Sequence, residues 1–173
     1  MRVVAGSAKG RRLVAPKGTA TRPTSDRVRE AIFAMLGSRI DLEGAAVADL
    51  FAGSGAMGIE ALSRGAASAT FVDSSADAVR AIKANLTATG FDGEVVRSDV
   101  LRYTHGHGGR FDVVFADPPY AWDAWDELLE NLDTTLVVAE SDRPMEVSEP
   151  SRVLKVARYG DTVVTLASHA TTR

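Results

Sequence analysis

The chain contains no cysteine. That absence excludes disulfide bonds, thiolate zinc sites and catalysis by a thiol. No apolar run approaches the roughly 18 residues that a membrane-spanning helix needs, and the first residues lack the basic, apolar and small-residue pattern of an export signal. With 45% hydrophobic and 25% charged residues among 173, the composition is that of a globular protein with a large core. We therefore expect a cytoplasmic protein.

Charge is distributed unevenly along the chain. Residues 1–30 carry eight basic and two acidic side chains, a net charge of +6, whereas the rest carries 12 basic and 21 acidic ones, a net charge of −9. A basic arm on an acidic body fits a polyanion gripped at one place. A solvated hairpin whose cations prevent aggregation explains the same pattern. The arm cations that would contact a polyanion are Arg2, Lys9, Arg11, Arg12, Lys17 and Arg22.

The pattern predicts two short strands at residues 2–6 and 11–15 that form a hairpin, followed by a loop and then by alternating helices and strands. Thr24, Ser25 and Asp26 are N-cap candidates for the first helix. We expect helices at 27–36, 57–64, 76–88 and 123–132, strands at 47–51, 69–73, 95–99, 111–116 and 135–139, a loop at 104–109, and a closing hairpin at 152–158 and 162–167.

This alternation predicts an α/β fold, in which helices cover both faces of a mainly parallel sheet and the closing hairpin adds an antiparallel edge. Residues 1–23 would form a hairpin extension, and residues 24–173 the sheet domain. Ligands of such sheets bind at the carboxyl ends of the strands. Four acids end predicted strands at that edge, which solubility alone does not explain: Asp49, Asp73, Asp99 and Asp117.

A glycine loop follows the strand that ends near Asp49. Gly53, Gly55 and Gly58 match G-x-G-x-x-G, which is a weak signal by itself. Asp73 follows Gly53 by 20 residues, where a carboxylate can accept from both ribose hydroxyls. NAD and S-adenosylmethionine both fit these facts. The alternative, glycines that only allow tight packing of helix on strand, is disfavoured by the position of Asp73.

Two acids favour S-adenosylmethionine over NAD. A carboxylate at Asp49 repels a pyrophosphate but suits an ammonium and a sulfonium. Asp99 can accept a hydrogen bond from an adenine amino group. The predicted cofactor contacts are Asp49, Phe51, Gly53, Ser54, Gly55, Gly58, Asp73, Ser74, Asp99, Val100 and Asp117.

The reaction motif Asp117-Pro118-Pro119-Tyr120 directly follows a buried strand. The Asp117 carboxylate and the Pro118 carbonyl offer two acceptors for one exocyclic amine of a nucleobase, and Tyr120 offers a ring that stacks on the base. Two acceptors would pull the nitrogen towards tetrahedral geometry and free its lone pair, so catalysis would rest on positioning and electrostatics. The alternative is that the prolines simply end a strand and Tyr120 packs on the core.

The chain resembles class I S-adenosylmethionine-dependent methyltransferases, and in particular the 16S rRNA guanine-N2 methyltransferase family (RsmD type). The matching segments are 2–13, 22–33, 49–58, 117–120, 137–140 and 158–162. The resemblance implies a Rossmann-like fold with a seven-stranded sheet, and a monomer that methylates one guanine of 16S rRNA in an assembling or assembled 30S particle. It also implies cofactor contacts at the glycine loop, Asp73 and Asp99, and an arm that grips RNA phosphates. Few residues lie between Glu140 and the closing hairpin, which departs from the family pattern.

Other readings of the same residues remain. A DNA adenine or cytosine amino-methylase fits the reaction motif, but Asp117 in place of asparagine and the absence of a large recognition domain disfavour it. An inactive binding module in ribosome assembly and an NAD-dependent oxidoreductase are further alternatives.

Several side chains near the predicted site have more than one reading. Trp122 and Trp125 either line an RNA surface or pack a helix, and Thr24 either caps a helix or approaches the ligands. Glu140 ends the fifth strand and could reach the site, but we expect it to be a solvated strand end. His105 and His107 lack a clustered third ligand, so we expect no metal site.

Overall fold

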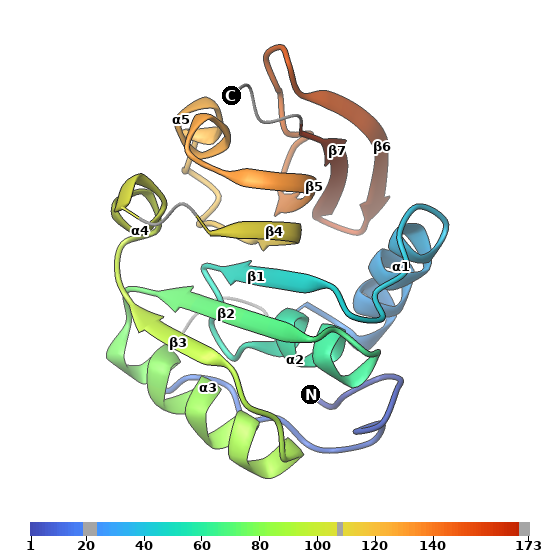
Figure 1. The fold of residues 1–173 in the computed structure, drawn as a ribbon, viewed down its shortest axis with the longest axis vertical. Coiled ribbons are helices and arrows are strands. Elements are labelled where there is room, and N and C mark those ends of the chain that lie inside the picture. Colours follow the sequence, from blue (N-terminus) through green and yellow to red (C-terminus); the bar gives the residue numbers. More distant parts are fainter. Residues whose placement is uncertain (19–23, 107–108, 170–173) are drawn as a thin grey trace.

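The computed structural model describes residues 1–18, 24–106 and 109–169. Its centre is a seven-stranded sheet in the order β3-β2-β1-β4-β5-β7-β6 (Figure 1). Strands β1 to β5 are parallel, and β7 runs antiparallel to its neighbours β5 and β6. The strands are β1 Ala46–Leu50, β2 Ser68–Asp73, β3 Glu94–Arg97, β4 Arg110–Ala116, β5 Asp133–Ser141, β6 Arg152–Tyr159 and β7 Thr162–Ser168.

Helices cover both faces of this sheet, as the alternating pattern predicts. Helices α1, α2 and α3 pack on one face through Ile32, Ile59 and Ile82. Helices α4 and α5 pack on the other face through Tyr103 and Leu128. The Rossmann-like α/β fold is therefore confirmed. The helices are α1 Asp26–Gly37, α2 Ala56–Ser63, α3 Ala76–Thr89, α4 Val100–Gly106 and α5 Trp125–Glu130.

Helix α4 corrects the expected loop at 104–109, because residues 104–106 belong to this helix. The Asp99 Oδ1 accepts a hydrogen bond from the Arg102 N–H at 3.0 Å and so caps the first turn. Val100, Tyr103 and Thr104 are buried at helical spacing, a pattern that the sequence already carries. Strand β3 consequently ends before Asp99 rather than at it. Among the described residues, no helix is long and apolar enough to cross a membrane.

The basic arm forms a hairpin with little regular strand. A single antiparallel bridge joins Arg2 and Arg12, and the Val3 N–H donates to the Arg11 carbonyl at 2.9 Å. The strands stay short because the next two N–H groups, of Val4 and Ala5, donate to the Glu60 carboxylate at 2.8 and 2.9 Å. These amides are therefore unavailable to a β-ladder.

The arm is docked on the body by hydrogen bonds to α2 and α3. The Ser7 N–H donates to the Ser63 carbonyl of α2 at 2.8 Å. Asn85 of α3 exchanges two hydrogen bonds with the backbone of Val14, at 2.8 and 2.9 Å. The Asn85 Nδ2 also donates to the Ser54 carbonyl at 2.8 Å. One buried amide thus ties the arm directly to the glycine loop.

Candidate functional site

Four carboxyl groups lie in a row along the carboxyl edge of the sheet. Side chains alternate between the two faces of a strand, and Val47, Phe71, Phe115 and Val138 all pack on the α1–α3 side. The residue two positions after each of these therefore points to the same side. Strand order places the four in sequence across β2, β1, β4 and β5, which lie side by side in Figure 1. We call Asp73, Asp49, Asp117 and Glu140 the acid row.

Asp49 is buried at the end of β1 and accepts a hydrogen bond from the Gly58 N–H at 2.9 Å. Burial raises the pKa of its carboxyl to about 8, and the nearby Asp117 and Asp73 add to the shift, although the Gly58 hydrogen bond opposes it. A positively charged ligand group placed here would favour the ionised form. The side chain is thus suited to hold a cation.

The glycine loop, residues 51–58, begins with an unusual backbone turn. Phe51 adopts a φ of 56°, a left-handed conformation that costs free energy in a non-glycine residue and often marks functional sites. The Gly53 N–H donates to the Asp73 Oδ2 at 2.9 Å. A Cβ on Gly58 would lie 2.4 Å from the Phe71 ring, whereas a Cβ on Gly53 would meet only the Phe51 carbonyl at 4.0 Å. Gly58 therefore serves close packing, and Gly53 lies beside open space.

Asp73 organises the loops at the end of β2. Its Oδ1 accepts from the Ser75 N–H at 2.9 Å, while Oδ2 receives the Gly53 N–H. Both oxygens keep further lone pairs for a ribose. Ser74 is exposed, and its carbonyl accepts from the Arg97 Nε at 3.2 Å. Asp99 lies exposed at the start of α4, and Val100 is buried under it.

The reaction motif lies next to Asp49 in the sheet. The Asp117 N–H contacts the Leu50 carbonyl at 3.5 Å, and the Trp122 N–H donates to the Pro119 carbonyl at 2.8 Å and closes a turn. Partial desolvation raises the pKa of Asp117 to about 6. This shift is smaller than that of Asp49, because Asp117 keeps accessible surface. The Tyr120 side chain is not packed on the core, since the residue is 58% exposed.

An aromatic cluster supports the motif from the other face of the sheet. The Phe51 and Trp122 rings meet edge to face with centroids 5.2 Å apart. Trp122 and Trp125 meet in the same way at 4.8 Å. The tryptophans are partly buried against the α4–α5 core, so they pack helix and loop together. The strained Phe51 turn thus connects the glycine loop to the reaction motif.

Glu140 is the member of the row for which the sequence interpretation favoured the wrong alternative. The expectation of a solvated strand end is wrong, because the residue is only 5% exposed. Its Oε2 accepts from the Thr24 hydroxyl at 2.9 Å. Desolvation, then the charge of Asp117, raises the pKa of Glu140 to about 8, although the Thr24 bond and the Arg29 charge oppose the shift. Leu136 and Val138 are buried on the α1–α3 side of β5, and Glu140 continues this alternation. That spacing could have predicted a buried Glu140.

Thr24 does not cap α1, because Ser25 does. The Ser25 hydroxyl accepts from the Val28 N–H at 3.3 Å. Arg29 is fully buried and its Nη1 donates to the Thr24 carbonyl at 3.1 Å. Its Nη2 bonds the Arg2 carbonyl and the Asp26 carboxylate. One guanidinium thus fixes the arm and the segment that holds Glu140.

Five of the six arm cations predicted to contact RNA are exposed in the structure: Arg2, Lys9, Arg11, Arg12 and Lys17. Arg2 pairs with Asp26 at 3.3 Å. The sixth, Arg22, lies outside the described residues.

The two histidines considered for a metal site are His105 and His107. His105 lies 3.2 Å from the Glu127 carboxylate, and His107 lies outside the described residues. No group of three potential ligands for a metal ion occurs in the described part of the chain.

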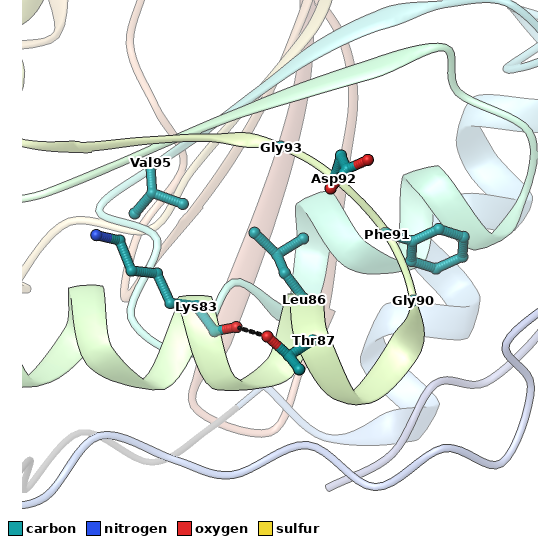
Figure 2. A pocket seen from close by; sticks show the side chains of 8 residues that line it. All are labelled: Lys83, Leu86, Thr87, Gly90, Phe91, Asp92, Gly93 and Val95. Carbon is teal, nitrogen blue, oxygen red and sulfur yellow. Dashed lines mark hydrogen bonds between the residues drawn. The ribbon is translucent and has the colours of Figure 1, made fainter.

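A separate pocket of about 430 Å³ lies between the end of α3 and the start of β3 (Figure 2). Lys83 and Asp92 line it, and both are exposed. It opens near Gly93, just before β3, whereas the acid row lies at the carboxyl ends of the strands. This pocket has no contact with the row.

A family model described as "Conserved hypothetical protein 95" matches residues 1–168. The chain belongs to this family. It is 41% identical to the putative rRNA methyltransferase YlbH of Bacillus subtilis, over 96% of this chain and 97% of that protein. It is 35% identical to the ribosomal RNA small subunit methyltransferase D of Escherichia coli, over 82% of this chain and 75% of that protein. The structure of the putative methyltransferase yhhF from Escherichia coli superposes with a TM-score of 0.86, 30% identity and 99% coverage of both chains. The resemblance to the RsmD type is thereby confirmed.

Proposed function

We propose that the chain transfers a methyl group from S-adenosylmethionine to the exocyclic N2 amine of a guanine in 16S rRNA. The observation that supports this most directly is the position of Asp117, beside Asp49 and the glycine loop on one face of the sheet. A nucleobase acceptor would then lie next to a cation-binding carboxylate. The relatives named as methyltransferases of small-subunit rRNA point to the same substrate class.

The residues of the glycine loop and the acid row fit this cofactor. Its ammonium and sulfonium would stabilise the ionised form of Asp49, which is buried with a pKa of about 8. Its ribose suits Asp73, whose carboxylate is fixed by two backbone amides. Gly53 leaves room for close approach of a ligand, and Asp99 would accept from the adenine amino group. When bound, S-adenosylmethionine supplies an electrophilic methyl group.

The reaction motif would hold and orient the amine. The Asp117 carboxylate and the Pro118 carbonyl accept its two hydrogens, so its lone pair is freed from the ring and aimed in one direction. Transfer of the methyl carbon from sulfur to nitrogen would make the nitrogen acidic, and Asp117, with a pKa of about 6, can accept the proton that the nitrogen loses and pass it to water. Tyr120 is exposed and would stack on a base flipped out of the RNA, worth about 1–3 kcal/mol.

The basic arm would grip phosphates near the target base, and such contacts position the RNA without specifying its sequence. Asn85 and Arg29 connect the arm to the glycine loop and to Thr24. Phosphates bound on the arm would therefore be held at a fixed position relative to the acid row. We expect a cytoplasmic monomer that acts on an assembling or assembled 30S particle.

The test uses purified protein, methyl-labelled S-adenosylmethionine and 30S particles from cells that lack the enzyme. The RNA is digested and the labelled nucleoside identified. Label in N2-methylguanosine is the expected result. Label in adenine or cytosine of added DNA would replace the rRNA assignment, and cofactor binding without transfer would favour an inactive binding module.

A further inference from the structure

Glu140 lies on the substrate side of the acid row. Ala116 and Ala139 are partners in the β4–β5 register, so the residues that follow them, Asp117 and Glu140, lie side by side on the same face of the sheet. Asp73 and Asp49 lie on the opposite side of Asp117, towards the glycine loop. If those two acids hold the cofactor, the next carboxyl beyond Asp117 faces the base.

Two neighbours hold the Glu140 carboxyl in place. Its Oε2 accepts the Thr24 hydroxyl at 2.9 Å, and the Thr24 carbonyl is held by the buried Arg29. Among the described residues, no hydrogen-bond donor to its Oε1 is found. The charged and titratable groups around it are Asp117 from β4, Asp49 from β1 and Arg29 from α1. Within the described part of the chain, one oxygen is thus anchored and the other has no donor.

The Watson–Crick edge of guanine places two donors side by side, the ring N1–H and the N2 amine. Adenine and cytosine place an acceptor nitrogen next to their amine. Enzymes that flip a base read this edge by hydrogen bonds. Two neighbouring carboxylates, each an acceptor, match the guanine pattern alone.

On the basis of the proposed function, we infer that Glu140 accepts the N1–H of the target guanine while Asp117 holds the adjacent amine. This pair of acceptors restricts methylation to guanine. A donor that contacts Oε1 also favours the ionised carboxylate, so base binding and ionisation of Glu140 reinforce each other. Thr24 and Arg29 act as positioning residues for this contact.

The variant Glu140→Gln tests the contact with little change of shape. If the amide oxygen keeps the Thr24 hydrogen bond, the amide NH2 takes the place of Oε1. That amide N–H would face the N1–H of guanine, and two donors repel each other. It can, however, donate a hydrogen bond to a ring nitrogen that carries no hydrogen. The base 2,6-diaminopurine has such a nitrogen and retains the N2 amine.

The experiment compares RNA carrying guanine or 2,6-diaminopurine at the target position, introduced by ligation of synthetic RNA and assembled into the particle. The measured quantity is the ratio of kcat/KM for the two bases, so a loss of active protein cancels. Wild type should prefer guanine by about 10-fold to 100-fold, which corresponds to the roughly 1–3 kcal/mol of a good pair of base contacts. Glu140→Gln should reverse or abolish this preference. Glu130→Gln changes an exposed carboxyl on α5 and should keep the wild-type ratio.

Other outcomes would refute either the role of Glu140 or the proposed function. Equal ratios for wild type and Glu140→Gln, with guanine N2 still methylated, overturn the inference and leave the proposed function standing. A wild-type ratio near one overturns it without recourse to any variant. If Glu140→Gln does not fold, Glu140→Ala replaces it, and its ratio should fall to near one. Wild type that methylates no guanine amine in unmodified particles refutes the proposed function itself.

Discussion

The two halves of the acid row are held in different ways. On the glycine-loop side, backbone N–H groups donate to both acids, those of Gly53 and Ser75 to Asp73 and that of Gly58 to Asp49. On the other side, the donors among the described residues are fewer: a side-chain hydroxyl donates to Glu140, and no donor to the Asp117 carboxylate is found. Asp73 and Asp49 are therefore held in place by backbone hydrogen bonds. The second pair keeps its hydrogen-bonding capacity for a substrate.

This difference suits the two ligands that the halves of the row would bind, a cofactor on one side and an RNA base on the other. A cofactor is the same molecule in every turnover, so a rigid backbone frame suits it. A base presented by RNA must enter and leave, and the exposed Asp117 beside an exposed Tyr120 allows that. The arm is anchored on the rigid half, through Glu60 and Ser63 of α2 and Asn85 of α3.

The sharpest way to separate the halves is Asp117→Ala. We expect transfer to fall by at least about 100-fold, as for loss of one preorganised electrostatic contact. Cofactor affinity, measured by calorimetry, should change little, because Asp49 and Asp73 keep their backbone partners. Asp123→Ala removes an exposed carboxyl a few residues away and is the control. A large loss of cofactor affinity in Asp117→Ala would refute the separation.

The docking of the arm on the rigid half can be broken at Gly6. Its φ is +81°, and a Cβ there would lie 1.7 Å from the Ser63 carbonyl oxygen. Gly6→Ala should therefore destabilise the protein by about 3 kcal/mol, from overpacking and left-handed strain together. At about 2–4 °C per kcal/mol for a domain of this size, thermal unfolding shows the loss clearly.

Gly10→Ala is the matched control for this change. Gly10 has a similar φ of +85°, but a Cβ there meets no atom within 4 Å. Its cost should be limited to the left-handed strain, about 1–2 kcal/mol. Equal destabilisation by the two variants would mean that the contact of the arm with α2 contributes nothing.

The raised pKa of Asp49 predicts how stability depends on pH. The unfolded chain releases this proton near pH 4, whereas the free native protein keeps it up to about pH 8. Between these values the native state binds more protons, so the free energy of unfolding decreases as pH rises. Asp49→Asn keeps an acceptor for the Gly58 N–H and should flatten this decrease.

The measurement is denaturant unfolding of the ligand-free protein from pH 5 to pH 9. Glu140→Gln should flatten the curve in the same sense, since burial also raises the pKa of Glu140 to about 8. Asp123→Asn controls for the change in net charge. Parallel curves for wild type and Asp49→Asn would show that Asp49 is ionised in the free protein.

The sequence predicted most of the rigid half and less of the other. Asp49, Gly53 and Asp73 stand at fixed spacing after apolar runs, so local pattern sufficed to place them together. Glu140 belongs to the row only because β5 lies beside β4 and because Thr24, distant in sequence, covers it. Such a contact depends on tertiary structure, which periodicity does not report.

The arm shows the same limit in a different way. The basic hairpin was predicted with two short strands, but in the structure a single bridge joins them. Glu60 takes two of the amides that further pairing needs, and nothing local to the arm indicates this. Helix α4, in contrast, was missed although Asp99 and the spacing of Val100, Tyr103 and Thr104 mark it.

The smallest expected effect is at the arm surface, where Arg11 and Arg12 are exposed. Replacing both by alanine should weaken RNA binding without changing cofactor affinity, because neither side chain takes part in docking on α2. Each lost phosphate contact should lower the slope of log affinity against log salt by about 0.7–0.9. The paired control is Arg102→Ala with Arg110→Ala, which removes two exposed cations outside the arm and should keep the wild-type slope. Equal slopes for wild type and the Arg11 and Arg12 double variant would reduce these cations to a solubility role, and the RNA would then be held by the reaction motif and its neighbours alone.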